Sequence, residues 1–391
     1  MPSPLAGTLV VDLSRYLPGP LAGRLLADLG ARVVKVEEPS LGDPIRTSPP
    51  VREGVGALGA ILLAGVESLA LDLKDPGAKE VLERLLARAD VLLESFRPGT
   101  LARLGFPPEE LRRRFPGLVI CSLSGWGQTG PYAARAGHDL GYQAAAGTLA
   151  STASMPAVPV ADMIGAWSAV TAILATLVER ERTRQGRWID ASLYDAGLHA
   201  NLVGWAAEAG GRKGIGERLP LTGAFPCYDL YETADGRRLA LAALEPHFWK
   251  RLCRAVDRND LARRQYSPSR KVRHQVKELV RGRTLAEWME ILAREDVPAE
   301  PVLSAAEVRS HPQAIDRALL SAGPDRLPRL AFPARLDGER PGISDVGGRV
   351  PELGEHTQAL LAELGVPRNV ETSPGVGRRF SFRRWLSTFL R

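Results

Sequence analysis

The 391-residue sequence has few cysteines and few aromatic residues. Its three cysteines, Cys121, Cys227 and Cys253, are odd in number and far apart, which favours a reducing compartment over a disulfide framework. Aromatic residues make up 6% and hydrophobic residues 45%, and this ordinary composition excludes a disordered or collagen-like chain. The length is sufficient for two domains, or for one large domain with an inserted lobe.

Long hydrophobic runs are also missing. No stretch approaches the roughly 18 apolar residues that a membrane span needs. The first apolar run has no basic stretch before it, unlike the start of a secretory signal peptide. We therefore expect a soluble, cytoplasmic protein.

Several binding motifs are absent as well. Gly19 and Gly23 are present after the first expected strand, but Leu21 stands where a Gly-x-Gly-x-x-Gly fingerprint needs its middle glycine, so an NAD site is disfavoured. There is no Walker-type glycine loop, and no Cys/His cluster has metal-ligand spacing, so we expect no metal. A Gly-x-Ser-x-Gly elbow is missing, which disfavours a serine hydrolase.

The first 125 residues alternate short apolar runs with helical patterns. Strands are predicted at 8–13, 32–36, 69–73, 90–94 and 118–123. Helices are predicted at 21–29, 76–88 and 108–115. Strands separated by helices are typical of a mainly parallel sheet, and they predict an α/β fold.

The rest of the chain predicts a second, smaller lobe. Apolar spacing predicts helices at 140–149, 163–180 and 193–205. A hairpin around Asp235-Gly236 and three helices, at 246–256, 271–280 and 284–293, then form an α+β lobe. Residues 324–350 look like a return strand or crossover. The predicted domain ranges are 1–210 for the large domain, 222–325 for the small lobe, 326–370 for a return segment and 371–391 for a tail.

Ionisable residues beside glycines, at the ends of expected elements, are the candidate functional residues. His138 lies in the Gly-His-Asp triplet 137–139 before a predicted helix, where a histidine is open to ligands and titrates near neutral pH. Asp139 suits an N-cap or first-turn role. Asp162 begins a long helix, so an N-cap and a catalytic carboxylate both remain open. Glu245 precedes a proline at a helix start, where a favourable interaction with the helix N-terminus also explains it.

At these residues the sequence resembles the superfamily of family III CoA-transferases and α-methylacyl-CoA racemases. The resemblance runs from about residue 4 to about residue 366. It rests on motifs in the family's order, namely Val11–Ser14, Pro18–Pro20, Leu26–Ala31, Val34–Glu37, Gly42–Pro44 with Arg46, Leu71–Lys74, Glu94–Gly99, Ser124–Gly127 and Gly137–Asp139.

The resemblance also separates two branches. In the transferases Asp162 would be the nucleophile, carrying the acyl group through anhydride and CoA-thioester intermediates, and an aromatic residue usually stands where His138 does. The racemase branch has Gly-His-Asp, an aspartate matching Asp162, and Leu-Glu-Pro, here at 244–246. The racemase branch is therefore favoured, with a transferase as the alternative and an inactive acyl-CoA-binding protein as a third possibility.

Racemisation beside a thioester carbonyl needs two bases, one on each face of the α-carbon. The resemblance assigns these roles to His138 and Asp162, with Glu245 orienting His138. The enolate oxygen needs preorganised donors, for which we expect backbone N–H groups at the helix N-termini near Gly137 and Asp162. CoA is part of the substrate, and no separate cofactor is expected.

The CoA moiety calls for basic side chains around its phosphates. Matching the motifs places a set of residues in CoA binding, namely Arg46, Leu71, Leu73, Lys74, Arg97, Arg103 and Gly137, with Leu71–Leu73 beside the adenine. The family commonly has Asn-Arg just before this strand, whereas this chain has 65–68 as Gly-Val-Glu-Ser, so some nucleotide contacts would differ.

By resemblance, the fold is a Rossmann-like large domain built from both chain ends, plus the small lobe. Two such chains interlock into a homodimer, with the active site between the large domain of one chain and the small lobe of the other. Glu245 would then reach His138 from the partner subunit.

The formal net charge of +6 comes mostly from the C-terminus. Five of the 51 basic residues lie in the last 14 positions, which have no acidic residue, and the rest of the chain has 46 basic against 45 acidic residues. We therefore expect no nucleic-acid partner. The tail interleaves arginines with aromatic residues and could form a basic amphipathic segment. We expect it to pack on the dimer or to stay unfolded rather than to contact a membrane.

Overall fold

The computed structural model describes residues 3–52, 54–150, 155–211, 221–323, 326–341 and 348–366. The chain forms two compact units. Unit 1 comprises Met1–Ala146, Ala157–Ala200 and Gln313–Arg391, and unit 2 comprises Gly147–Pro156 and Asn201–Pro312. The predicted tail at 371–391 lies outside the described residues.

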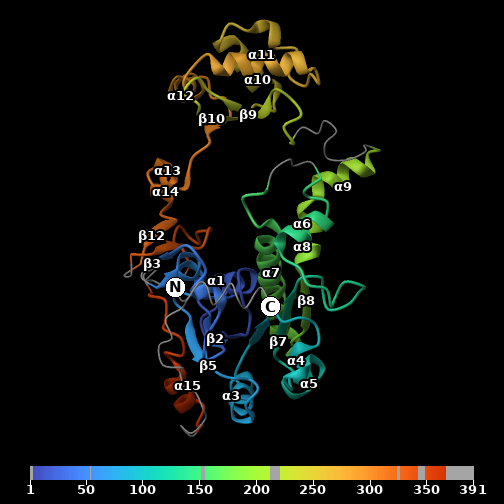
Figure 1. Ribbon diagram of the computed structural model, residues 1–391, viewed down its shortest axis with the longest axis vertical. Helices are drawn as coiled ribbons and strands as arrows, with labels where there is room; N and C mark the ends of the chain where they lie inside the picture. The colour runs from blue at the N-terminus through green and yellow to red at the C-terminus, as the bar shows by residue number, and fades with distance from the viewer. Residues whose placement is uncertain are drawn as a thin grey trace. The chain divides into compact units, whose positions relative to one another are not determined.

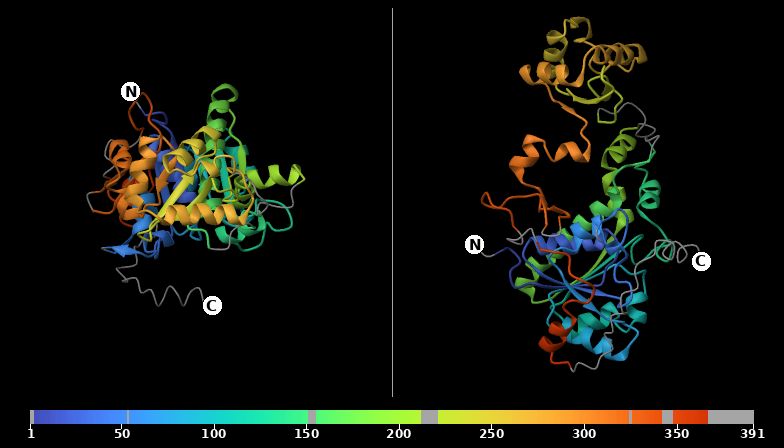
Figure 2. Two further views of the ribbon diagram at one scale, coloured as in Figure 1. Left: turned by 90° about the horizontal axis from the view of Figure 1, so that it is seen from above. Right: turned by 60° about the vertical axis from the view of Figure 1, so that its left-hand side comes forward.

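Unit 1 is built on a six-stranded parallel sheet (Figures 1 and 2). Its strands are β1 (Leu9–Asp12), β2 (Arg32–Glu37), β5 (Glu67–Ala70), β6 (Val91–Glu94), β7 (Val119–Ser124) and β8 (Trp188–Ser192). The strand order is β5-β2-β1-β6-β7-β8, so the chain moves outward in one direction from β1 and in the other from β6. This order is that of dinucleotide-binding folds, and its switch point lies between β1 and β6.

Helices cover both faces of this sheet, so successive strand residues enter different cores. Val10 belongs to a cluster with α1 (Pro18–Asp28) and α7 (Val160–Thr183), whereas Val11 belongs to a cluster with α3 (Pro76–Leu86). Burial on both faces explains why these strands are almost continuously apolar. The other helices of unit 1 are α2 (Ala57–Leu62), α4 (Thr100–Arg103), α5 (Pro108–Arg114), α6 (Asp139–Ala145), α8 (Leu193–Ala200) and α15 (Thr357–Glu363).

Short elements complete this part of the chain. Three-residue helix η1 (Pro44–Arg46) follows β2, and strands β3 (Val51–Arg52) and β4 (Val55–Gly56) pair antiparallel. Strand β12 (Leu320–Ala322) pairs with β13 (Pro328–Leu330), so the only strand within 324–350, in the described part of that segment, pairs with β12 and not with the central sheet. Helix α14 (Pro312–Arg317) precedes this hairpin.

Helix α7 is long and apolar enough, by length and composition, to cross a membrane, contrary to the expectation from the sequence that no stretch approaches this. In unit 1 it packs against α1, α8 and β7. Ala161, Ala169 and Ile173 on this helix are fully buried in the core. A helix that is apolar on most sides is typical of a protein core as well as of a membrane.

Unit 2 contains a three-stranded antiparallel sheet, in the order β11-β10-β9, with helices packed against it. The strands are β9 (Tyr228–Glu232), β10 (Arg238–Ala242) and β11 (Ala299–Pro301). The helices are α9 (Leu202–Ala209), α10 (Pro246–Ala255), η2 (Asn259–Leu261), α11 (Arg270–Arg281), α12 (Leu285–Arg294) and α13 (Ala305–Val308). Trp249 and Trp288 fill its core.

Most predicted elements are confirmed, including the hairpin, whose turn has Gly236 at a φ of +71°. Three predicted details are wrong, and one strand was missed. Strand β5 ends at Ala70, so Leu71 and Leu73 lie beyond it; α6 ends at Ala145; the helix predicted at 193–205 breaks at Asn201; and the edge strand β8 was not predicted. Strand β8 carries the exposed Asp190 and has a neighbour on one side only, which hides the apolar signal of a buried strand.

The three cysteines are all buried and free. The expectation that the protein has no disulfide framework is confirmed.

Candidate functional site

A cavity of about 410 Å³ opens in unit 1 where β1, β6 and β7 end. Its wall consists of the segments that follow these strands, together with the starts of α6, α7 and α8. The lining residues are Arg15, Tyr16, Pro18, Ser95–Pro98, Leu123–Trp126, Ala133, Arg135–His138, Tyr142, Asp162 and Leu193. The carboxyl ends of parallel strands at a switch point are where open α/β sheets bind ligands.

The segment after β1 is held in an unusual conformation by buried charges. Tyr16 has a φ of +68°, and its N–H donates to Asp43 Oδ1 over 3.1 Å. Lys35 Nζ donates to the carbonyl oxygen of Ser14 over 2.7 Å, and the Ser14 N–H donates to Asp12 Oδ1 over 2.7 Å. This wall of the cavity is therefore anchored in the sheet before any ligand binds.

His138 and Asp162 both line this cavity, as expected for the two proposed bases. His138 is the N-cap residue of α6, is exposed, and makes no capping hydrogen bond with its side chain. Asp162 lies in the first turn of α7 and is partly buried. The sequence placed both residues at helix starts, and the tertiary fold brings the two starts to one cavity.

Asp139 connects these two helix starts. Its Oδ1 accepts the backbone N–H of Asp162 over 3.1 Å, and its Oδ2 accepts Gln143 Nε2 over 2.6 Å. The first-turn role expected for Asp139 in α6 is thus accompanied by a contact to α7. The Asp162 N–H donates to Asp139 and is therefore not free for an enolate oxygen, whereas the donors expected among the other backbone N–H groups near Gly137 and Asp162 stay a prediction.

The carboxyl group of Asp162 has a pKa close to neutral pH. Burial, followed by the negative charge of Asp139, raises the pKa of Asp162 to about 7. A carboxyl group with this pKa is present in both protonation states near neutral pH, as a group that both removes and returns a proton requires.

Tyr142 lines the cavity, and its ring leaves no room for a side chain at two nearby glycines. A Cβ atom on Gly125 would lie 2.1 Å from Tyr142 Oη, and one on Gly137 would lie 2.5 Å from Tyr142 Cε1. The Tyr142 ring also meets Trp126 edge-on at 5.0 Å between ring centroids. The glycines of both motifs are therefore required to admit this ring.

Arg15, Arg97 and Arg135 provide positive charge at the cavity. Arg97 was predicted from the motif, whereas Arg15 and Arg135 were not. Within the described ranges no ion pair involves these three guanidinium groups, although Arg135 stacks over Tyr132 at 4.7 Å from its ring centroid. Their positions in the sequence could have indicated them, because Arg15 follows β1 and Arg135 lies three residues before His138.

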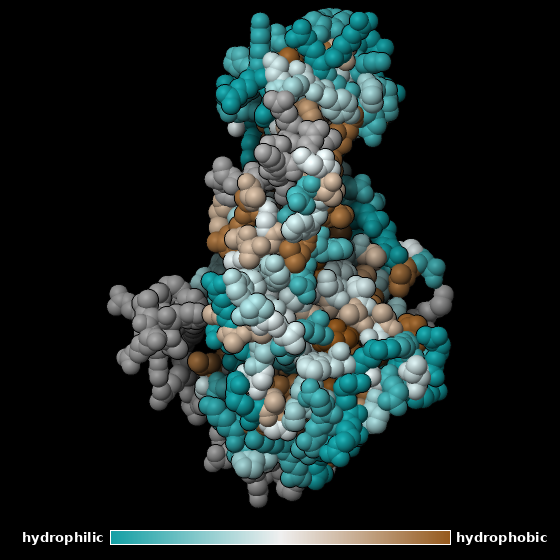
Figure 3. All heavy atoms as spheres, turned by 90° about the vertical axis from the view of Figure 1, so that its right-hand side faces the viewer, coloured by the Kyte–Doolittle hydropathy of each residue, from teal (hydrophilic) through white to brown (hydrophobic). Residues whose placement is uncertain are grey.

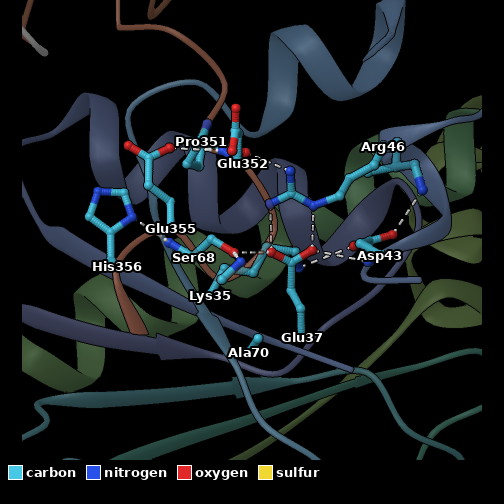
Figure 4. A network of polar contacts seen from close by, with 12 residues as sticks. Lys35, Glu37, Asp43, Arg46, Ser68, Ala70, Pro351, Glu352, Glu355 and His356 are labelled. Carbon is cyan, nitrogen blue, oxygen red and sulfur yellow. Dashed lines mark hydrogen bonds and ion pairs between the residues drawn. The ribbon is translucent and has the colours of Figure 1, made fainter. Parts of the chain in front are cut away.

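Arg46 is engaged elsewhere, in the buried network that Figure 4 shows. Its Nε and Nη2 donate to the two carboxylate oxygens of Glu37 over 2.7 and 2.6 Å, and its Nη1 donates to the carbonyl oxygen of Pro351 over 2.7 Å. Burial disfavours the Glu37 carboxylate, but Arg46 and then Lys35 outweigh burial and hold the pKa of Glu37 below its usual range. Arg46 thereby fastens a C-terminal segment of unit 1 to the sheet.

The remaining predicted residues lie outside the cavity wall. Lys74 and Arg103 are exposed, and Arg103 donates to Thr100 Oγ1 over 2.7 Å. Leu71 is buried beside the end of β5, and Leu73 is partly buried. Glu245 belongs to unit 2, where it is the exposed N-cap residue of α10.

In the part of the chain that the structure describes, no group of three or more His, Cys, Asp or Glu side chains is placed to hold a metal ion.

Solved structures show the class of fold to which the chain belongs. A CAIB/BAIF family protein from Brucella suis matches it with a TM-score of 0.81 and 31% sequence identity, over 93% of this chain and 100% of that chain. The fold is therefore the α/β fold with a parallel central sheet that this group of proteins shares.

Residues 5–357 match the family described as CoA-transferase family III, and the chain belongs to this family. It is similar to human alpha-methylacyl-CoA racemase, with 35% identity over 93% of this chain and 94% of that protein. It is also similar to acetyl-CoA:oxalate CoA-transferase from Acetobacter aceti, with 32% identity over 93% of this chain and 96% of that protein. The resemblance found in the sequence is confirmed, and both activities occur among the relatives.

Proposed function

We propose that the protein is an α-methylacyl-CoA racemase that interconverts the 2R and 2S forms of 2-methylacyl-CoA thioesters. The observation that carries this proposal is that His138 and Asp162 line the same cavity at the carboxyl ends of the strands. Two groups that can each gain and lose a proton are what a 1,1-proton transfer needs.

In one direction, ionised Asp162 removes the α-proton, and the electron pair of the C–H bond moves into the thioester to form an enolate. Protonated His138 then returns a proton to the opposite face of the α-carbon, and the carbonyl group reforms. In the other direction, neutral His138 removes the proton and protonated Asp162 returns one. The reaction as written balances without a metal or redox cofactor.

A CoA-transferase is the second candidate, because the relatives include transferases and Asp162 would be its nucleophile. The pKa of Asp162 favours the racemase. The racemase uses this group in both protonation states, whereas a nucleophilic carboxylate uses only the ionised state, and a pKa of about 7, caused by burial and Asp139, populates both states at neutral pH.

The proposal includes a homodimer in which Glu245 of the partner subunit orients His138. Exposed apolar side chains support an interface between chains. On α9, Leu202 is 64% exposed and Trp205 is 46% exposed, and Figure 3 shows apolar residues at several places among polar ones on the face it displays. A dimer is expected at working concentrations, and a preparation that is active as a monomer contradicts this part of the proposal. A cytoplasmic location, in keeping with three free thiols, is also part of it.

The decisive experiment is to incubate a 2-methylacyl-CoA thioester with the protein in deuterated water, without any acceptor acid. The racemase predicts deuterium at the α-carbon and interconversion of the two epimers. The transferase predicts no label and a turnover that requires a second carboxylic acid, with an acyl adduct that can be trapped on Asp162. Binding without either reaction indicates an inactive acyl-CoA-binding protein.

A further inference from the structure

The enolate oxygen of the proposed reaction needs a hydrogen-bond donor, and one expected donor is already used. The backbone N–H at the start of α7, that of Asp162, donates to Asp139 Oδ1 over 3.1 Å. A side chain of the cavity wall can supply such a donor.

Tyr142 has the geometry of such a donor. It is 5% exposed, and it lines the cavity together with His138 and Asp162. Its ring is held between the backbone at Gly125 and Gly137, where added Cβ atoms would lie 2.1 and 2.5 Å from it. Trp126 packs edge-on against the same ring. The position of Oη is consequently set by packing and not by a hydrogen bond of its own.

The hydroxyl group of Tyr142 is also available. Among the residues that the structure describes, none forms a hydrogen bond with Tyr142 Oη. Burial, followed by the charge of Asp162, raises the pKa of Tyr142 to about 12, so the group keeps its proton at neutral pH. Oη is not among the fully buried polar atoms that lack a partner, so it is accessible from the cavity and can donate to a ligand there.

We propose that Tyr142 Oη donates a hydrogen bond to the carbonyl oxygen of the substrate thioester, and holds this oxygen as it becomes the enolate oxygen. No proton is transferred in this step, because the hydroxyl group stabilises charge only. The inference rests on the proposed acyl-CoA function and assigns a catalytic role to a residue that the motif match left out.

The test compares Tyr142→Phe with Tyr132→Phe. Phenylalanine keeps the ring of Tyr142 in place, and Tyr132 is a matched control because it also packs on Trp126, at 5.1 Å, but is not part of the cavity wall. We expect Tyr142→Phe to lower kcat by about 10²–10³-fold, as removal of an oxyanion donor does, and to raise KM by no more than about tenfold. Tyr132→Phe is expected to stay within about twofold of wild type.

A binding measurement separates this role from a structural one. Calorimetry gives the Kd of a 2-methylacyl-CoA thioester and of the matching thioether, which has CH₂ in place of the carbonyl group. Wild type is expected to prefer the thioester by about tenfold, and Tyr142→Phe to lose this preference while still binding the thioether normally.

The outcomes distinguish the two proposals. Full activity and an unchanged thioester preference in Tyr142→Phe overturn the role of Tyr142 and leave the racemase intact. Loss of the preference in a protein that shows no α-proton exchange supports the contact of Tyr142 with the thioester carbonyl oxygen, and overturns the racemase together with the enolate part of the role. If Tyr142→Phe instead shifts the pH dependence assigned to Asp162 and keeps the preference, Tyr142 acts on Asp162 and the inference is wrong.

Discussion

Two regions of unit 1 are rich in charged side chains, but the charges are used differently. In the network of Lys35, Glu37, Asp43 and Arg46, each charge is paired and all but the partly buried Arg46 are buried, for example Lys35 Nζ with Asp43 Oδ2 at 3.1 Å. At the cavity, by contrast, Arg97 and Asp162 line a space large enough for a ligand.

The difference shows which charges hold the fold and which are available for binding. Burial by itself disfavours the Lys35 ammonium group, but Asp12, Asp43 and Glu37 outweigh burial and hold the pKa of Lys35 above its usual value. At Asp162 burial comes first and a like charge adds to it, so the pKa rises toward neutrality. Paired charges stay ionised over the physiological range, and the unpaired carboxyl group can exchange protons.

The largest effect is expected at the cavity. Asp162→Asn removes one of the two bases and should lower interconversion of the epimers by about 10³-fold, within the range of lost general acid–base catalysis. The epimer whose α-proton faces His138 should still exchange this proton in deuterated water, which NMR detects. Glu181→Gln, an exposed residue near the other end of α7, is the control. A loss of less than tenfold contradicts the two-base mechanism.

The next effect is expected in the buried network, on stability. Lys35→Met leaves Asp12 and Asp43 buried without their cation and should lower the free energy of unfolding by about 3–5 kcal/mol. Urea unfolding measures this change. The surface pair of Arg84 and Glu80 serves for comparison, and Arg84→Ala should cost less than about 1 kcal/mol. If the two substitutions lowered the free energy of unfolding equally, the buried network would stabilise the fold no more than the surface pair does.

The arginines allow a direct comparison of the two regions. Arg97→Ala should raise KM for the CoA thioester about 10–100-fold through loss of a charge-assisted contact, but not KM for the shorter pantetheine thioester, which lacks the nucleotide phosphates. Arg46→Ala should lower the unfolding midpoint and leave KM nearly unchanged, because its guanidinium group is bound to Glu37 and Pro351. If Arg46→Ala raised KM for the CoA thioester and Arg97→Ala did not, Arg46 would belong to the CoA site.

The smallest effect is a shift in pH dependence. In the direction in which Asp162 is the base, kcat/KM should rise as the pH increases through about 7, the raised pKa caused by burial and Asp139. Asp139→Asn removes the like charge and keeps an acceptor for the Asp162 N–H, so the midpoint should move down by roughly half to one pH unit. His138 and Tyr142 also face this cavity and are unchanged in the variant. An upward shift contradicts the assignment of this titration to Asp162.

Local patterns predicted most of the sheet and the helices, because strands buried on both faces and helices with one apolar face are visible in short stretches of sequence. Strand β8 was missed because its exposed Asp190 interrupts the apolar run. The break at Asn201 was missed because nothing in the apolar periodicity of 193–205 marks it. Such features depend on neighbours in space rather than on neighbours in the chain.

The candidate site was predictable in part for the same reason. His138, Asp162 and Arg97 lie in recognisable motifs, and the structure brings them to one cavity. Arg15 and Arg135 were missed because a surface arginine and a ligand-binding arginine look alike in a sequence. Arg46 matches a family motif, but only the folded chain shows that Glu37 and Pro351 occupy its guanidinium group.

The amino-acid sequence alone determined the α/β class and the family. It also determined the chemical groups from which an active site can be built. The small number of cysteines, with which the sequence first suggested a protein without disulfides, is matched by three buried thiols. Which charges are paired and which remain free for a ligand is decided by the tertiary structure. The reason is physical, since the pKa of Asp162 and the partners of Arg46 depend on burial and on residues far away in the chain.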